Sequence, residues 1–159
     1  MSYKIIDNFL PEDIFNPLFD LMSSYHFPWY FNEFVADEDS PLDNFQFTHT
    51  FFNTSIDVVH TPYHNFISPI IDRLDVKKLE RVKANLNPRT STHEEGGYHI
   101  DMEDCTTSIL YMNTNNGWTE IQGSGKIDCV ENRAVTFNSN LMHSCLLYTS
   151  PSPRDSSQS

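Results

Sequence analysis

The second half of the chain consists of short stretches that favour β-strands and are separated by turn signals. Val82, Ala84 and Leu86 alternate with polar neighbours, which is the period of a half-buried strand. Further strand-like runs cover residues 105–113, 126–130 and 134–138, and the turn signals are Asn115-Asn116-Gly117 and Gly123-Ser124-Gly125. Many short strands with regular turns favour a sandwich or barrel, and we expect a mainly β jelly roll.

A strand and a helix are expected at the N-terminus. Lys4-Ile5-Ile6 predicts a short strand, and Asn8 or a neighbour can cap the helix that follows. Pro11 suits the first turn of that helix, and Pro17 predicts a kink or a late start. Its expected apolar stripe recurs every three or four residues, at Ile14, Leu18, Met22 and Tyr25.

The region between this helix and the strand-rich half is aromatic. Residues 27–34 are expected to be extended, and residues 36–41 form an acidic loop. Residues 44–54 alternate, which predicts a strand with Phe45, Phe47, His49 and Phe51 on one face. Residues 63–74 have helical spacing despite Pro69. Pro62 lies between His60 and His64 and argues against a zinc pair there.

Length and composition limit the class of protein. The 159 residues include 12 Phe, 7 Tyr and 2 Trp, enough for one domain with a sizeable core. The net charge of −12 has the wrong sign for attraction to phosphate, so we do not expect nucleic acid as a partner. The oligomeric state does not follow from the sequence.

Cysteine content and the N-terminus bear on the compartment. Three cysteines without a Cys-x-x-Cys pair, Cys105, Cys129 and Cys145, favour free thiols in a reducing cytosol. The N-terminus has no long apolar run, so we expect neither a secretory signal nor a membrane span. These features favour a cytoplasmic protein.

His99-Ile100-Asp101, followed later by His143, is the strongest candidate for a functional site. Residues two apart on an extended strand point the same way, so His99 and Asp101 can bind one face of a metal. Two imidazoles and one carboxylate form the facial triad that holds non-haem Fe(II) and leaves three positions open. The alternative is a turn histidine and a capping aspartate, with His143 at a strand end.

The end of the chain does not fit a jelly roll. A final strand should close the sheet after His143, but residues 149–159 contain five serines and two prolines. The run from Leu146 to Asp155 resembles a translated sequencing adaptor. We therefore expect a domain over residues 1–145, whose last strand is missing or replaced, and a disordered or artefactual tail over residues 146–159. A genuine disordered tail is the alternative.

Several segments together resemble the Fe(II)/2-oxoglutarate-dependent dioxygenases. The closest branch is the small prolyl-4-hydroxylase-like oxygenases of marine phages and bacteria. The resemblance covers residues 79–144, the N-terminal half fitting only loosely, and its segments are residues 81–90, 97–101, 109–119 and 131–144. It implies a cupin-like double-stranded β-helix braced by N-terminal helices. A phage-encoded member would act in the host-cell cytoplasm.

The resemblance also assigns roles to individual residues. His99, Asp101 and His143 would be the iron ligands and catalytic residues, and the Tyr111 hydroxyl would reach the carboxylate of 2-oxoglutarate. A core tyrosine is the alternative for Tyr111. The family needs a basic residue about ten positions past the distal histidine to receive the far carboxylate. Arg154 lies eleven positions beyond His143, but in a Pro-Arg-Asp-Ser context rather than on an apolar strand.

These roles imply a hydroxylase that uses Fe(II), 2-oxoglutarate and O₂ and releases succinate and CO₂. Ascorbate is a candidate stimulant of its activity. Its substrate would be a peptidyl, prolyl-like group or a small molecule. Two alternatives stay open. One is a non-catalytic jelly-roll module that binds a metal or ligand at a vestigial site. The other is a cupin-type metalloenzyme, such as an isomerase, that needs no cosubstrate.

Overall fold

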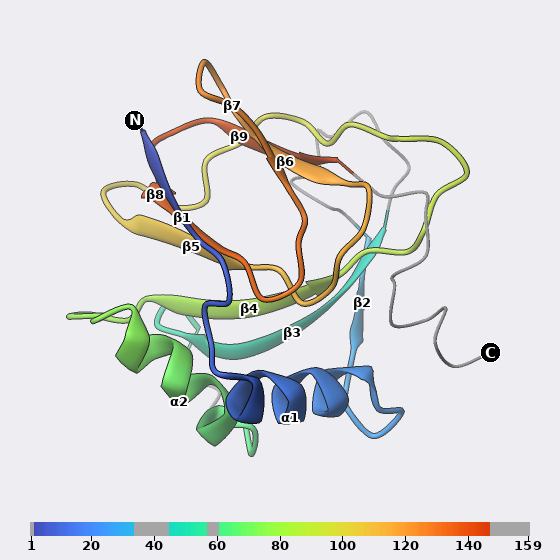
Figure 1. Ribbon diagram of the computed structural model, residues 1–159, viewed down its shortest axis with the longest axis vertical. Helices are drawn as coiled ribbons and strands as arrows, with labels where there is room; N and C mark the ends of the chain where they lie inside the picture. Colours follow the sequence, from blue (N-terminus) through green and yellow to red (C-terminus); the bar gives the residue numbers. More distant parts are fainter. Residues whose placement is uncertain (1, 34–44, 57–60, 147–159) are drawn as a thin grey trace. The chain divides into compact units, whose positions relative to one another are not determined.

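The computed structural model describes residues 2–33, 45–56 and 61–146, and the chain divides into two compact units. Unit 1 comprises Met1–Phe9, Phe34–Asn44 and Pro88–Ser159, and unit 2 comprises Leu10–Glu33 and Phe45–Asn87. Within the described residues, the secondary structure is mainly β, in three antiparallel sheets with two helices, as the strand-rich sequence predicts (Figure 1).

The described part of unit 1 forms two three-stranded antiparallel sheets. One has the order β1-β8-β5 and the other the order β7-β6-β9. The strands are β1 (Tyr3–Ile6), β5 (Thr106–Leu110), β6 (Trp118–Ile121), β7 (Gly125–Asp128), β8 (Ala134–Asn138) and β9 (His143–Leu146). Buried side chains from both sheets form one core cluster, which contains Tyr111, Ile121, Ile127, Val135 and Phe137. The pairing of β1 with β8 ties the start of the chain to its strand-rich half.

The two predicted turns of unit 1 have different roles. Gly123-Ser124-Gly125 closes the β6–β7 hairpin, in which Ile121 pairs with Gly125. Gly123 and Gly125 have positive φ values of 75° and 111°, which explains why glycine suits both positions. Asn115-Asn116-Gly117 instead connects β5 to β6, which belong to different sheets. This turn therefore carries the chain from one sheet to the other.

In unit 2, the described residues form a three-stranded antiparallel sheet and two helices. Its elements are α1 (Glu12–Ser23), β2 (Tyr30–Asn32), β3 (Gln46–Asn53), α2 (His64–Arg73) and β4 (Arg81–Leu86), with strand order β2-β3-β4. Both helices lie on the same side of this sheet (Figure 1). Phe27, Phe51 and Ile67 are the buried centre of the unit.

The first helix differs in detail from the expectation. Pro11 is its N-cap residue and makes no side-chain capping bond, whereas Asn8 lies earlier in the chain with a φ of 50°. The helix continues through Pro17, which lacks the N–H of a regular turn. Phe15 and Leu18 are its buried residues, and Tyr25 lies beyond its end with 92% exposure.

The expected alternation in β3 holds only in part. His49 and Phe51 are buried as predicted, but Phe45 is 43% exposed and Gln46 is buried in its place. Phe45 packs instead against Phe31, with ring centroids 5.4 Å apart. A register shift between Thr50 and Phe52 also breaks the regular pairing of β3 with β4, which a periodic pattern does not anticipate.

Several segments with a predicted structure or role lie at or beyond the ends of the described ranges. The acidic loop at residues 36–41, His60 and the tail beyond Leu146 lie outside the described residues. Leu146 itself, assigned to the tail on sequence grounds, is the last residue of β9 and pairs with Trp118. The three cysteines are free, as expected. Neither of the two described helices is long and apolar enough to cross a membrane.

Candidate metal centre

The loop before β5 brings His99 beside β9. His99 and His143 form an isolated antiparallel bridge, in which each backbone N–H donates to the carbonyl of the other residue at 3.0 Å. Glu95 forms a second bridge to Leu146. These two bridges hold the loop along β9, so that His99 is fixed by backbone pairing although it lies outside a regular strand.

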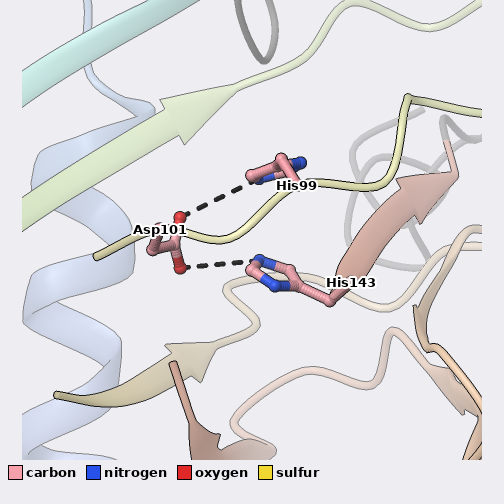
Figure 2. A group of neighbouring side chains, drawn as sticks. All are labelled: His99, Asp101 and His143. Carbon is pink, nitrogen blue, oxygen red and sulfur yellow. Dashed lines mark ion pairs between the residues drawn. The ribbon is translucent and has the colours of Figure 1, made fainter. Parts of the chain in front are cut away.

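The side chains of His99, Asp101 and His143 converge in unit 1 (Figure 2). One ligand atom from each residue lies within 4.8 Å of the others. The Asp101 carboxylate lies between the two imidazoles, with Oδ1 3.8 Å from His99 Nε2 and Oδ2 3.5 Å from His143 Nε2. The three residues that the sequence nominated as metal ligands are therefore brought together by the fold.

Both imidazoles are oriented by backbone carbonyls. His99 Nδ1 lies 3.1 Å from the carbonyl oxygen of Gly97, and His143 Nδ1 lies 3.3 Å from that of Leu141. A carbonyl only accepts, so Nδ1 carries the proton in each ring and Nε2 of the neutral ring has a free lone pair. Outer hydrogen bonds of this kind fix the tautomer and direction of metal-binding histidines.

The Asp101 carboxylate is held by a hydroxyl group. Thr107, on β5, donates from Oγ1 to Asp101 Oδ2 at 3.2 Å. Asp101 is therefore attached to the first residues of a sheet strand, although it lies in the preceding loop. Thr107 is not among the residues predicted from the sequence, and no local spacing signal distinguishes it from other strand threonines.

Burial differs among the three residues and affects their protonation. The His143 side chain is only 3% exposed, and its ring packs edge-on against Phe137 at a centroid distance of 5.0 Å. Burial lowers the pKa of His143 below its usual value, a shift that the nearby Asp101 carboxylate partly opposes. His143 therefore favours the neutral form, the form in which an imidazole binds a metal.

Tyr111 lies in the core of unit 1. Its hydroxyl donates to Thr119 Oγ1 at 2.8 Å, and burial raises the pKa of the phenol above its usual range. Thr119 pairs with Cys145 across β6 and β9, and the next pair on the same face is Ile121 with His143. Tyr111 thus reaches the sheet face that also carries His143, through Thr119, which is not among the residues predicted from the sequence.

The cluster can hold a metal ion, which is the chemical capacity that the geometry supports. Arg154, the predicted carboxylate partner, lies outside the described residues. The sequence matches no protein-family model and no curated protein at a significant level. The metal-ligand geometry is therefore the observation on which a function for this chain must rest.

Proposed function

We propose that the chain is an Fe(II)- and 2-oxoglutarate-dependent oxygenase built on a jelly roll, acting in the cytoplasm on a peptidyl, prolyl-like or small-molecule carbon. The observation that carries the proposal is the convergence of His99, Asp101 and His143 in unit 1. Two imidazoles and one carboxylate are the facial ligand set of non-haem iron oxygenases. The two antiparallel sheets of unit 1 support a jelly roll as its framework.

The donor set suits a divalent ion. Ligand atoms bound about 2.1 Å from one ion lie roughly 3–4 Å apart. Each Nε2 lies within this range of one Asp101 oxygen, His99 Nε2 at 3.8 Å from Oδ1 and His143 Nε2 at 3.5 Å from Oδ2. Both Nδ1 atoms face carbonyl oxygens, so both Nε2 atoms are free to bind. The three residues would hold the ion from one side.

The remaining roles belong to side chains around this cluster. Bound Fe(II) and 2-oxoglutarate supply the activation of O₂ and the hydroxylation, with succinate and CO₂ as co-products. Thr107 fixes the Asp101 carboxylate, and Phe137 keeps water from one side of His143. Tyr111 and Thr119 offer hydroxyls for the 2-oxoglutarate carboxylate, and Arg154 is the proposed partner of its far end.

A metal-binding module without cosubstrate is the second candidate. One observation favours it: the Tyr111 hydroxyl already donates to Thr119 within the core. A hydroxyl that is used in this way contributes to packing in the absence of any ligand. This candidate predicts a bound metal but no turnover of 2-oxoglutarate.

The deciding experiment is an anaerobic titration of the protein with Fe(II) and then with 2-oxoglutarate. A chelated 2-oxo acid on Fe(II) gives a visible charge-transfer absorption, which the proposal predicts. Exposure to air should then yield succinate. The His99→Ala and His143→Ala variants should lose the absorption, because each removes one ligand atom.

His93→Ala is the matched control, because His93 is an exposed histidine of the same unit outside the cluster. It should retain the absorption. Iron binding without the absorption and without succinate would support the metal-binding module instead. Succinate formation by the His143→Ala variant at the rate of the unaltered protein would contradict both candidates.

A further inference from the structure

The loop that carries His99 also contacts the outer face of sheet β7-β6-β9, the face turned away from the metal ligands. Across an antiparallel bridge, the residue before one partner lies beside the residue after the other. The bridge of His99 to His143 therefore places Tyr98 beside Ser144. Successive side chains of an extended chain point to opposite faces. Because the His99 and His143 side chains point toward Asp101, those of Tyr98 and Ser144 lie on the outer face (Figure 2).

Glu120 lies on the same outer face. It pairs with Ser144 across β6 and β9, and the next residue of β6, Ile121, pairs with His143. Ile121 is fully buried in the core of unit 1, so Glu120 points the other way. One row of side chains therefore crosses the outer face, from Tyr98 on the loop through Ser144 on β9 to Glu120 on β6.

The two ends of this row are joined by a side-chain hydrogen bond between Tyr98 and Glu120. The Tyr98 hydroxyl is the donor, because an ionised carboxylate can only accept. Ser144, between them, is only 7% exposed although it lies on the face away from the core, so its side chain is covered. The Tyr98 side chain therefore crosses β9 and connects the loop to β6.

The backbone bridge at His99 gains support from this side-chain contact. The bridge is isolated, so it is not part of a continuous ladder. The Gly96 N–H donates to β9 at 3.2 Å, but Gly97 follows it, and a Cβ at Gly97 would meet nothing within 4 Å. The bond from Tyr98 to Glu120 supplies a side-chain anchor directly next to His99.

We propose that Tyr98 and Glu120 are positioning residues of the metal centre. Their hydrogen bond holds the loop against the outer face of the sheet and thereby fixes the His99 imidazole on the inner face, beside Asp101. Neither residue would touch the metal. This inference rests on the proposed function for its meaning, but the effect on the loop exists without a metal and can be measured separately.

The order of the loop is measured in the metal-free protein by ¹⁵N relaxation of the His99 backbone N–H. A rigid backbone has an order parameter of about 0.85, and a flexible segment has one below about 0.6. Tyr98→Phe removes only the hydroxyl, and Glu120→Leu removes its acceptor. Both variants should lower the order parameter of His99 toward the flexible range. The order parameter of Val135, in the central strand β8, should not change.

The affinity for Fe(II), measured anaerobically, should fall by about tenfold in both variants, the lower end of the effect of groups that orient a metal ligand. Glu120→Gln removes the charge but keeps an oxygen that accepts the hydrogen bond, so it should retain most of the affinity. The double variant Tyr98→Phe/Glu120→Leu should lose no more than either single variant, because both remove the same bond. Tyr25→Phe, at a tyrosine that is 92% exposed, is the matched control and should bind Fe(II) normally.

The proposal is overturned if Tyr98→Phe leaves either the order parameter of His99 or the Fe(II) affinity unchanged. It is also overturned if Glu120→Gln loses as much affinity as Glu120→Leu, or if the double variant loses the sum of the two single losses. If Glu120→Leu does not fold, Tyr98→Phe and Glu120→Gln decide the question. An unaltered protein that binds no Fe(II) would contradict the proposed function, whereas the order parameters, measured without metal, test the hydrogen bond independently of it.

Discussion

His99 and His143 exchange both of their backbone hydrogen bonds across a single antiparallel bridge, at 3.0 Å in each direction. Their ring centroids are 4.6 Å apart as a result. The same backbone contact that fixes the loop to β9 therefore also sets the spacing between two of the three ligand residues. The integrity of this loop contact should determine the affinity for a metal.

Substitution of Gly96 tests whether the affinity for a metal depends on the contact between the loop and β9. A Cβ at this position would lie 3.0 Å from the carbonyl oxygen of Cys145, to which the Gly96 N–H donates at 3.2 Å. Gly96→Ala should therefore push the loop away from β9, destabilise the protein by about 1–3 kcal/mol and weaken Fe(II) binding. Chemical denaturation and anaerobic metal titration measure the two effects.

Gly97→Ala is the matched control for this substitution. Nothing lies within 4 Å of a Cβ at Gly97, and its φ is not positive. The change should alter stability by no more than about 0.5 kcal/mol and leave Fe(II) binding intact. Equal effects of the two alanines would show that close approach of Gly96 to β9 does not control the site.

Thr107 offers a test of how Asp101 is held. Thr107→Val removes the hydroxyl that donates to Asp101 Oδ2 and preserves the β-branched shape. We expect Fe(II) affinity to fall by about 10- to 100-fold, the usual effect of losing a group that orients a metal ligand. Thr107→Ser keeps the hydroxyl and should restore most of the affinity, whereas an equal loss in both variants would point to packing.

Substitution of Tyr111 distinguishes a role in binding the cosubstrate from a role in packing alone. Tyr111→Phe removes the hydrogen bond to Thr119 and should destabilise the protein by about 1 kcal/mol. If the hydroxyl also binds 2-oxoglutarate, the dissociation constant of that ligand should rise by about tenfold or more, with Fe(II) affinity unchanged. Both constants come from the anaerobic titrations.

Tyr25→Phe is the control, because Tyr25 is 92% exposed. It should change neither stability nor ligand binding. A Tyr111→Phe protein that is less stable but binds 2-oxoglutarate with normal affinity would assign Tyr111 to the core alone. That result would favour the alternative in which the tyrosine serves packing.

The features that could be predicted from the sequence are local in origin. The Gly123-Ser124-Gly125 turn was predictable because only glycine adopts positive φ at no cost, and the structure shows a hairpin there. The strands at residues 126–130 and 134–138 follow from β-branched and apolar residues, and β7 and β8 cover most of both. The types and order of His99, Asp101 and His143 also predicted a set of metal ligands, and the fold brings these three residues together.

The features that could not be predicted depend on long-range contacts. The bridge of His99 to His143 and the bond from Thr107 to Asp101 join separate segments, and no periodicity encodes them. Burial of Gln46 in place of Phe45 depends on aromatic packing between β2 and β3.

His143 gives a prediction for the pH dependence of the metal-free protein. Burial lowers its pKa below the usual value of 6.5. As the pH is lowered, the unfolded chain therefore takes up a proton at this residue at a higher pH than the folded chain does. Between the two pKa values the unfolded state binds more protons, and stability must therefore fall as the pH decreases below about 6.5. The contribution of this one group is at most about 1.4 kcal/mol per pH unit.

Urea denaturation of the metal-free protein between neutral and mildly acidic pH measures this slope. His143→Gln removes the titrating group and keeps a side chain that can donate to the Leu141 carbonyl, so its stability should depend less on pH. His93→Gln, at an exposed site, should keep the slope of the unaltered protein. Identical slopes in all three proteins would mean that His143 titrates alike in the folded and unfolded chains, contrary to its burial against Phe137.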